Sequence, residues 1–197
     1  MKSNLKIVFM QLALLLLSFG CKNQDCDCPA NFKNIQFMQR NTPVPNDFTG
    51  KWWVKSVAPV KNSPQFVTDI IMYSYKDGVL NGRSACWRSA RWREGEEGEK
   101  LFWEKYYKKG NLEILKIYNL KNGKIWSEET FSKNKKNGKA IYWDISGVKI
   151  AEGIYKNGKP YSGSFRELKL IEPEPLQSIA VYADGELVKR SEWGPWE

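Results

Sequence analysis

Residues 142–163 read YWDISGVKIAEGIYKNGKPYSG. Two turn dipeptides, Ser146-Gly147 and Asn157-Gly158, separate runs in which aromatic, β-branched and charged residues are mixed. Asn-Gly favours the two-residue type I′ hairpin turn, because both central residues must take positive φ. The stretch therefore predicts a β-hairpin and the start of another.

The first of these turns also predicts a register. With Ser146-Gly147 as the turn, counting outward gives three facing pairs, namely Ile145 with Val148, Asp144 with Lys149, and Trp143 with Ile150. Two pairs are apolar and share one face, whereas the third is an ion pair on the other face. Such a register suits a sheet that is buried on one side.

The same spacing recurs along the chain, with an apolar residue three places before a glycine and another apolar residue or a proline two places after it. Counting from these turns predicts five cross-strand pairs, which are Tyr75 with Leu80, Tyr107 with Leu112, Leu120 with Ile125, Tyr155 with Pro160, and Tyr182 with Leu187. The expected turn glycines are Gly78, Gly110, Gly123, Gly138, Gly147, Gly158 and Gly185. Because the same kind of cross-strand pair recurs beside each turn, the spacing predicts an array of hairpins.

This pattern resembles the MORN-variant repeat, in which Tyr-x-x-Gly-x-Leu is followed by a short strand and another glycine. Residues 102–163 carry the resemblance most clearly, weaker copies lie near residues 50, 75 and 181, and residues 83–101 interrupt the spacing. The resemblance implies an all-β fold, a meander of antiparallel β-hairpin repeats in an open, solenoid-like sheet. Bacterial proteins with such repeats are often labelled antitoxin-like.

A second fold is suggested by residues 48–53, FTGKWW, which resemble the Gly-x-Trp that opens lipocalin-like barrels. A chain of this size could close an eight-stranded barrel around a small apolar ligand. The repeated glycine spacing downstream favours the hairpin array. A lipocalin-like carrier of a small apolar ligand is therefore the alternative expectation.

The first twenty residues differ from the rest of the chain. Lys2 and Lys6 precede an apolar run over residues 7–17, which is too short for a membrane span and typical of a secretory signal peptide. The run leads into LLSFGC, which resembles the lipobox of bacterial lipoproteins, where the signal is cut before a cysteine that carries the lipid. The resemblance implies lipidation at Cys21.

Three parts are therefore expected. They are a signal peptide over residues 1–20, a lipid-anchored flexible tether over residues 21–47, and a MORN-variant β-repeat domain over residues 48–197. The tether is polar and contains prolines, as flexible linkers do. The mature chain is expected outside the cytoplasm, anchored by lipid to a bacterial membrane, at the outer membrane or cell surface.

The charge of the chain bears on its partners. The signal peptide holds two of the 31 basic residues and none of the 22 acidic ones, so the mature chain keeps 29 and 22 and carries a net charge of +7. Outside the cytoplasm, a basic chain meets lipid headgroups and acidic polysaccharides rather than nucleic acid. Many of the lysines also suit turns and sheet edges.

The cysteines predict one disulfide. Cys26 and Cys28 stand too close in sequence to bridge each other, so a bond from one of them to Cys86 is expected in an oxidising compartment. The chain has no histidine and no paired Cys-x-x-Cys spacing, so no metal and no cofactor is expected.

The lack of histidine also excludes Ser-His and Cys-His catalysis. The densest acid cluster is Glu94, Glu96, Glu97 and Glu99, in a segment broken by glycines that favours a solvated connection. A carbohydrate-active enzyme that uses Glu94 or Glu97 is the second alternative.

Residues 87–93, WRSARWR, are the one stretch where bases and aromatics alternate. They form a candidate ligand patch of Trp87, Arg88, Arg91, Trp92 and Arg93, which could stack on sugars or hold an acidic glycan. The plainer interpretation is an edge strand with its arginines outward and its tryptophans in the core. The leading expectation is a binding or scaffolding module without catalysis, whose partner is a protein or an anionic glycan.

Overall fold

A computed structural model describes residues 35–59, 66–89, 98–169, 176–192 and 194–195 of the 197-residue chain. The chain divides into two compact units, residues 1–35 and residues 36–197. All the strands lie in the second unit. The expected signal peptide and most of the expected tether fall outside the described residues.

The second unit is one antiparallel sheet of thirteen strands. Its first seven strands are β1 (Gly50–Pro59), β2 (Phe66–Lys76), β3 (Val79–Leu80), β4 (Gly82–Ser89), β5 (Lys100–Lys108), β6 (Asn111–Tyr118) and β7 (Ile125–Ser132). The others are β8 (Lys135–Trp143), β9 (Lys149–Lys156), β10 (Lys159–Lys169), β11 (Leu176–Ala183), β12 (Glu186–Arg190) and β13 (Gly194–Pro195). No helix occurs among the described residues.

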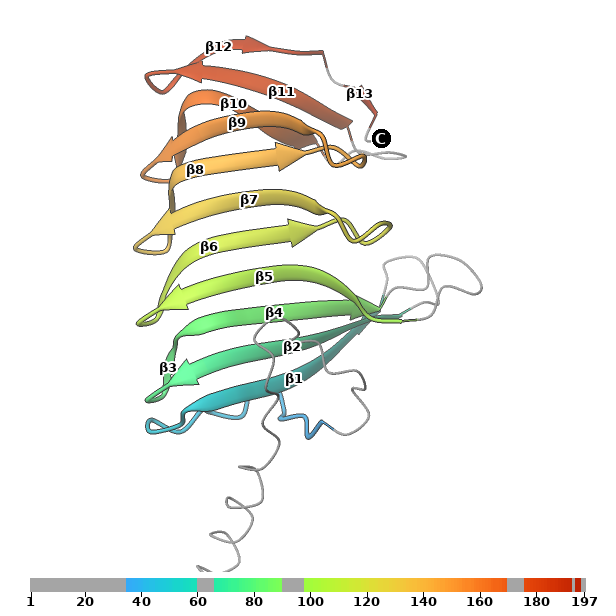
Figure 1. Cartoon of the computed structure of the whole chain (residues 1–197), viewed down its shortest axis with the longest axis vertical. Coiled ribbons are helices and arrows are strands. Elements are labelled where there is room, and N and C mark those ends of the chain that lie inside the picture. Colours follow the sequence, from blue (N-terminus) through green and yellow to red (C-terminus); the bar gives the residue numbers. More distant parts are fainter. Residues whose placement is uncertain (1–34, 60–65, 90–97, 170–175, 193, 196–197) are drawn as a thin grey trace, which may run out of the picture. The chain divides into compact units, whose positions relative to one another are not determined.

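The strands follow one another through the sheet in the order of the sequence (Figure 1). The path runs from β1 to β12, and the short strands β3 and β13 pair beside it with β2 and β11. The prediction of an all-β meander of antiparallel hairpins is confirmed. The strands β1 and β12 stand at opposite ends and do not pair, so the sheet is open and the closed eight-stranded barrel of the lipocalin-like alternative is wrong.

Four of the five predicted cross-strand pairs are present. They are Tyr75 with Leu80, Tyr107 with Leu112, Tyr155 with Pro160, and Tyr182 with Leu187. Each pair flanks a turn in which both central residues have positive φ, at Asp77-Gly78, Lys109-Gly110, Asn157-Gly158 and Asp184-Gly185. These are the two-residue turns that match the twist of the strands.

The hairpin tips are hydrogen-bonded to one another. In each of these turns the glycine N–H donates to a carbonyl of the preceding hairpin or segment, from Gly78 to Phe48 (2.8 Å), Gly110 to Leu80 (2.8 Å), Gly158 to Lys136 (2.7 Å) and Gly185 to Tyr161 (2.8 Å). These bonds hold each of the four tips level with the hairpin or segment before it. The register of one hairpin therefore constrains the register of the next.

The predicted turn at Gly138 is wrong. The turn lies at Lys133-Asn134, where both residues have positive φ, and Gly138 lies inside β8. Turns at 109–110, 133–134 and 157–158 keep a spacing of 24 residues that a turn at Gly138 would break. Gly138 is needed for another reason, since its φ is +93° and a Cβ there would lie 2.6 Å from the Thr130 hydroxyl oxygen.

The register predicted from Ser146-Gly147 is also wrong. Gly147 has positive φ, but the connection spans residues 144–148, and Trp143 faces Lys149 instead of Ile150. The Asp144 carboxylate decides this geometry, because it accepts the Val148 N–H at 2.8 Å and the Ser146 hydroxyl at 2.7 Å. An aspartate that bonds its own loop widens a turn in this way.

The loop that contains Gly123 differs for the same reason. Tyr118, and not Leu120, faces Ile125. The Asn119 side chain accepts the Lys121 N–H at 2.8 Å, and the Asn119 carbonyl accepts the Gly123 N–H at 2.8 Å. The connection is therefore a six-residue loop over residues 119–124.

A buried cluster in the C-terminal half packs large side chains against small ones. It consists of Ala140, Tyr142, Ala151 and Phe165. The Phe165 ring lies edge-on to Tyr155 (4.8 Å between centroids) and to Tyr182 (5.7 Å). A Cβ on Gly153 would lie 2.4 Å from this ring, so the strand β9 has no side chain where Phe165 packs.

The two ends of the sheet differ. At the first end, the Met38 N–H donates to the Trp53 carbonyl at 2.8 Å, and Phe48 packs edge-on to Trp52 with centroids 5.2 Å apart. The segment before β1 therefore covers part of that edge. At the other end, all five residues of β12 are exposed.

The turn assignment predicts a stability difference between two glycines. Gly158→Ala should lower the free energy of unfolding by about 1–2 kcal/mol, because φ is +89° there while a Cβ would meet no atom within 4 Å. Gly194→Ala, at an ordinary φ and also in open space, should change it by less than about 0.5 kcal/mol. Urea denaturation of both variants measures the difference, and equal losses would contradict the turn.

Candidate functional site

Much of the predicted chemistry lies outside the described residues. The expected lipidation site, two of the cysteines, the second half of the ligand patch and most of the acid cluster belong there, namely Cys21, Cys26, Cys28, Arg91, Trp92, Arg93, Glu94, Glu96 and Glu97. The roles expected of these residues stay predictions. Glu99 is described and exposed, next to the start of β5.

The described half of the ligand patch is built into the sheet. Trp87 is 2% exposed and its ring stacks on Trp53, with centroids 5.7 Å apart. Arg88 forms two hydrogen bonds with the Asp69 carboxylate, at 2.7 and 2.8 Å, and its guanidinium lies 3.9 Å from the centre of the Phe102 ring. Their strand, β4, lies between β2 and β5 and is not an edge strand.

Cys86 is fully buried and forms no disulfide within the described residues. Burial raises the pKa of the Cys86 thiol to about 12, and the nearby Asp69 carboxylate adds to the effect. The thiol is therefore protonated at neutral pH, and it is a poor nucleophile there. Its predicted partners, Cys26 and Cys28, lie outside the described residues, so the disulfide stays a prediction.

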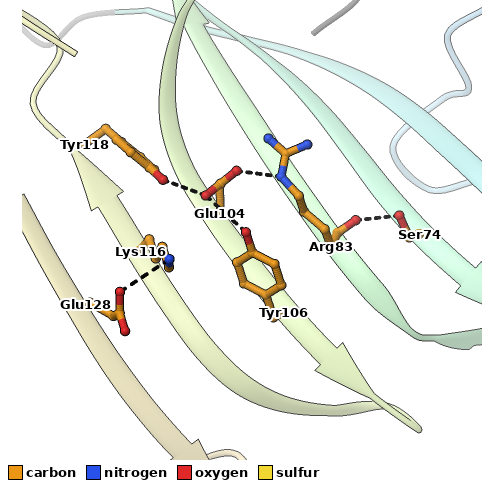
Figure 2. A network of polar contacts seen from close by, with 7 residues as sticks. All are labelled: Ser74, Arg83, Glu104, Tyr106, Lys116, Tyr118 and Glu128. Carbon is orange, nitrogen blue, oxygen red and sulfur yellow. Dashed lines mark hydrogen bonds and ion pairs between the residues drawn. The ribbon is translucent and has the colours of Figure 1, made fainter. Parts of the chain in front are cut away.

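A buried carboxylate organises the centre of one face of the sheet. Glu104 on β5 is 7% exposed, and Arg83 on β4 donates through Nε to its Oε1 at 2.5 Å. The hydroxyl of Tyr118 donates to the other oxygen, Oε2, at 2.6 Å, and that of Tyr106 lies 3.4 Å from the same atom. Figure 2 shows the carboxylate between the guanidinium and the two phenols.

The phenols of this network stay protonated well above neutral pH. Burial raises the pKa of Tyr118, and the hydrogen bond to Glu104 raises it further, because an ionised phenol could not donate. Burial also raises the pKa of Tyr106, with a contribution from the Glu104 charge. Each group donates and the carboxylate accepts, so the buried charge has its partners inside the sheet.

A second buried carboxylate lies on the opposite face. Glu104 and Glu128 each stand opposite Lys116, so they share one face, and Glu129, the next residue, points to the other. Glu129 is 6% exposed and accepts Lys136 Nζ at 2.8 Å and the Tyr142 hydroxyl at 3.0 Å.

The network around Glu129 extends along its face. The Tyr142 and Tyr155 hydroxyls are 3.3 Å apart, and burial, followed by the charge of Glu129, raises the pKa of Tyr142. Tyr142 also belongs to the buried cluster of the C-terminal half. This polar network is therefore continuous with the hydrophobic core.

Arg166 on β10 ties distant strands together. Its guanidinium donates to the carbonyls of Trp143 (3.1 Å) and Trp126 (3.3 Å). The guanidinium carbon lies 4.2 Å from the centre of the Trp126 ring and 5.4 Å from that of Tyr142. Burial lowers the pKa of Arg166 to about 10, so the group is still charged at neutral pH. Its bonds connect β10 with β7 and β8.

Sequence reasoning missed both buried glutamates, although a signal was available for one of them, Glu104. Glu104, Glu128 and Glu152 stand 24 residues apart, at the same position of successive repeats, and they lie on alternate strands of one face. Glu152 is more exposed and pairs with Lys139 (2.8 Å) and Lys149 (2.7 Å). A search for dense acid clusters finds Glu94 to Glu99 and overlooks a periodic glutamate.

The two buried networks are structural in their chemistry. Both carboxylates are held by donors from neighbouring strands, and such an arrangement fixes strand pairing. The exposed large apolar side chains lie elsewhere and on several elements, among them Val57 on β1 and, on β12, Val188 (66% exposed) and Leu187 (44%).

Two kinds of feature are absent from the described residues. No three of their His, Cys, Asp and Glu side chains gather as metal ligands. Within the same ranges, no helix has the length and apolar character that crossing a membrane would require.

Comparison with known proteins adds no family. The scan against protein-family models finds no match to this chain, and the search of curated proteins finds no significant match either.

The Glu104 network predicts that removing one charge at this position destabilises the fold. Glu104→Gln should lower the free energy of unfolding by about 1–3 kcal/mol, because the buried Arg83–Glu104 ion pair loses its negative partner. Glu128→Gln is the matched control. The Glu128 pair with Lys116 is half-exposed and 3.4 Å long, so its loss should change stability by less than about 0.5 kcal/mol. Urea denaturation distinguishes the two, and equal effects would contradict the structural role of Glu104.

The state of Cys86 can be read by alkylation. In the folded chain at neutral pH, iodoacetamide should leave Cys86 unmodified, because the thiol is buried and its pKa is about 12. After unfolding without reductant, a free Cys86 should be alkylated completely, as peptide mass spectrometry would show. Alkylation only after reduction would instead establish the predicted disulfide to Cys26 or Cys28.

Proposed function

We propose that this chain is a lipid-anchored, extracytoplasmic β-repeat protein that works as a binding or scaffolding module without chemistry of its own. The anchor is the lipid on Cys21, at the end of the apolar signal run. The partner on the membrane is a protein or an anionic glycan, in keeping with the net charge of +7 that the mature chain carries after its two signal lysines are removed.

The observation that carries the proposal is the single-layered open sheet. Along the path from β1 to β12 the strands pair in the order of the sequence, with the short strands β3 and β13 beside the path, and the path does not close. An array of this kind is extended and leaves both faces at least partly accessible, which favours contact with large partners. The half-buried side chains of its interior strands, such as those of β6, agree with this.

The buried polar groups support binding over catalysis. Glu104 and Glu129 are each hydrogen-bonded by a cation and a tyrosine within the sheet. A carboxylate that acts as an acid, base or nucleophile has to reach a substrate, whereas these are enclosed. The enzyme alternative rests on Glu94 and Glu97, which lie outside the described residues.

The resemblance to MORN-variant repeats agrees with the hairpin array. The antitoxin label attached to such repeats implies a cytoplasmic partner, which an exported chain would not meet. The proposal therefore takes the repeat type from the resemblance and the compartment from the signal sequence.

The anchor is tested by Cys21→Ser. The variant should lose lipid labelling and appear in the soluble fraction, because the cysteine is the only proposed attachment point and a multiply acylated terminus holds a chain on the membrane. Labelling with a fatty-acid analogue, membrane fractionation and the mass of the mature N-terminus measure this. An unchanged membrane fraction together with an unchanged N-terminal mass would overturn the anchor.

The partner is sought by cross-linking in intact cells. The wild-type chain should give a defined cross-linked species that the Cys21→Ser chain, released from the membrane, does not give. Mass spectrometry identifies a protein partner, and loss of the species after glycan digestion identifies an anionic glycan. Identical products from both chains would contradict a membrane-bound partner.

A further inference from the structure

The edge of β12 repeats a position that earlier hairpins use to hold the next one. In three of these hairpins, the residue two places after the second turn residue points its backbone groups toward the following hairpin, and in the β9–β10 hairpin Tyr161, one place further on, does so. The Leu80 and Lys136 carbonyls accept glycine N–H groups of the next tips, at 2.8 and 2.7 Å. The Leu112 N–H donates to the Asn134 side chain of its next tip at 2.9 Å.

The corresponding residue of the last hairpin is Leu187. It stands two places after Gly185 and pairs with Tyr182, as Leu112 pairs with Tyr107. By this equivalence, its N–H and C=O point away from β11, toward the open side of the sheet. Arg190, opposite Ala180, is the next such residue, because Ser191, which directly follows it, turns its N–H back to the Ile179 carbonyl at 2.9 Å.

The end that carries this edge is accessible. All five residues of β12 are exposed, and Val188 is 66% exposed. The other end of the sheet is different, because Met38 bonds to β1 and Phe48 accepts the N–H of Gly78. A head-to-tail stack of copies would need both edges, so the pairing that fits is β12 with β12.

We propose that β12 pairs antiparallel with β12 of a second copy of this chain, about a two-fold axis, and joins the two sheets into one. Leu187 lies opposite Arg190 of the second copy, and this pairs the outward backbone groups of each with those of the other. Because the axis is two-fold, the pairing of Leu187 with Arg190 forms twice, once from each copy.

The side chains of β12 suit this register. Glu186 and Lys189 lie on one face, since they stand opposite Ala183 and Val181 of β11, two residues apart. In the dimer, each Glu186 is the diagonal neighbour of Lys189 in the other copy, within reach of an ion pair. Arg190 is already paired with Glu167 at 2.8 Å, so its charge does not oppose the second copy.

The strand also has a bulge at its centre, and the bulge is compatible with self-pairing. The register between β11 and β12 shifts at Val181 and Tyr182, which leaves Val188 as the extra residue of β12. Against an ordinary strand this residue would disturb the register, and bulges usually discourage edge pairing. Against a second β12 in this register, Val188 of each copy faces Lys189 of the other, so both strands have two residues between their paired positions and keep the same length.

The decisive variant is Leu187→Pro, because the chain itself shows that the fold tolerates it. Pro160 occupies the equivalent position of β10, opposite Tyr155. The substitution removes an N–H that only the second copy would use. The circular dichroism spectrum and urea midpoint should stay close to those of the wild type, while self-association is lost.

A charge exchange tests the register. Lys189→Glu places two acids together across the axis and should raise the dissociation constant of the dimer about tenfold or more. The double variant Glu186→Lys, Lys189→Glu restores the pair and should recover the wild-type value. Lys159→Glu, which makes the same charge change at an exposed position of β10, should have no effect.

The measurement is sedimentation equilibrium of the full chain in detergent over a range of concentrations. A concentration-dependent dimer that Leu187→Pro abolishes and the charge exchange restores supports the proposal. A wild-type chain that is monomeric at all concentrations overturns the proposal, and so does a dimer that Leu187→Pro leaves intact. If β12 instead binds a different protein, the purified chain stays monomeric, and the proposal is wrong. The Cys21→Ser chain should still dimerise, so failure of the anchor and failure of this pairing are distinguishable.

Discussion

The hydrogen bond from the glycine N–H of a two-residue turn to the preceding hairpin or segment is the interaction on which the rest of the sheet depends. A two-residue turn with positive φ at both central positions directs its glycine N–H outward, where the Leu80, Lys136 or Tyr161 carbonyl accepts it. The bond fixes the height of one hairpin against the next. With the height fixed, the same Tyr–Leu or Tyr–Pro pair can recur beside each turn, and the strands continue as an array.

A single-layered sheet has a thin interior, and this constrains how it is stabilised. The described core is assembled from small residues beside a few large ones, as Gly153 beneath the Phe165 ring illustrates. Polar networks add stability that a thin hydrophobic core does not provide. Glu104 and Glu129 connect neighbouring strands on opposite faces of the sheet. Arg166 does the same over a longer range, because its bonds reach from β10 to β7 and β8.

These constraints also shape what the molecule can do. Side chains that are fully engaged in holding strands together are not available for other contacts, so a binding surface of the proposed module would lie on the outer sides or at the ends of the array. The ends are unlike, since β1 has a covering segment and β12 is exposed. An array with one open end can associate in pairs without growing into a filament, and a pair of sheets on one membrane would offer a longer scaffold.

Local signals in the sequence determined the fold class and four hairpin registers. Asn-Gly, Asp-Gly and Lys-Gly turns act through the positive φ of their own residues, so Tyr155 opposite Pro160 or Tyr182 opposite Leu187 could be predicted by counting. Counting failed where a side chain reorganised its loop, as Asp144 does by accepting the Val148 N–H, and where the 24-residue spacing placed a turn at Lys133-Asn134, which has no glycine.

The buried networks could not be predicted in this way. Glu104 and Glu129 acquire their roles from Arg83, Tyr118, Lys136 and Tyr142, which stand on other strands and come close only through the pairing of the sheet. A turn is specified by neighbours in sequence, whereas the burial of a charge depends on which donors the completed sheet brings around it. The sequence therefore determined the hairpins and their order, and the tertiary structure alone decided which of its many charges are buried, paired and held within the sheet.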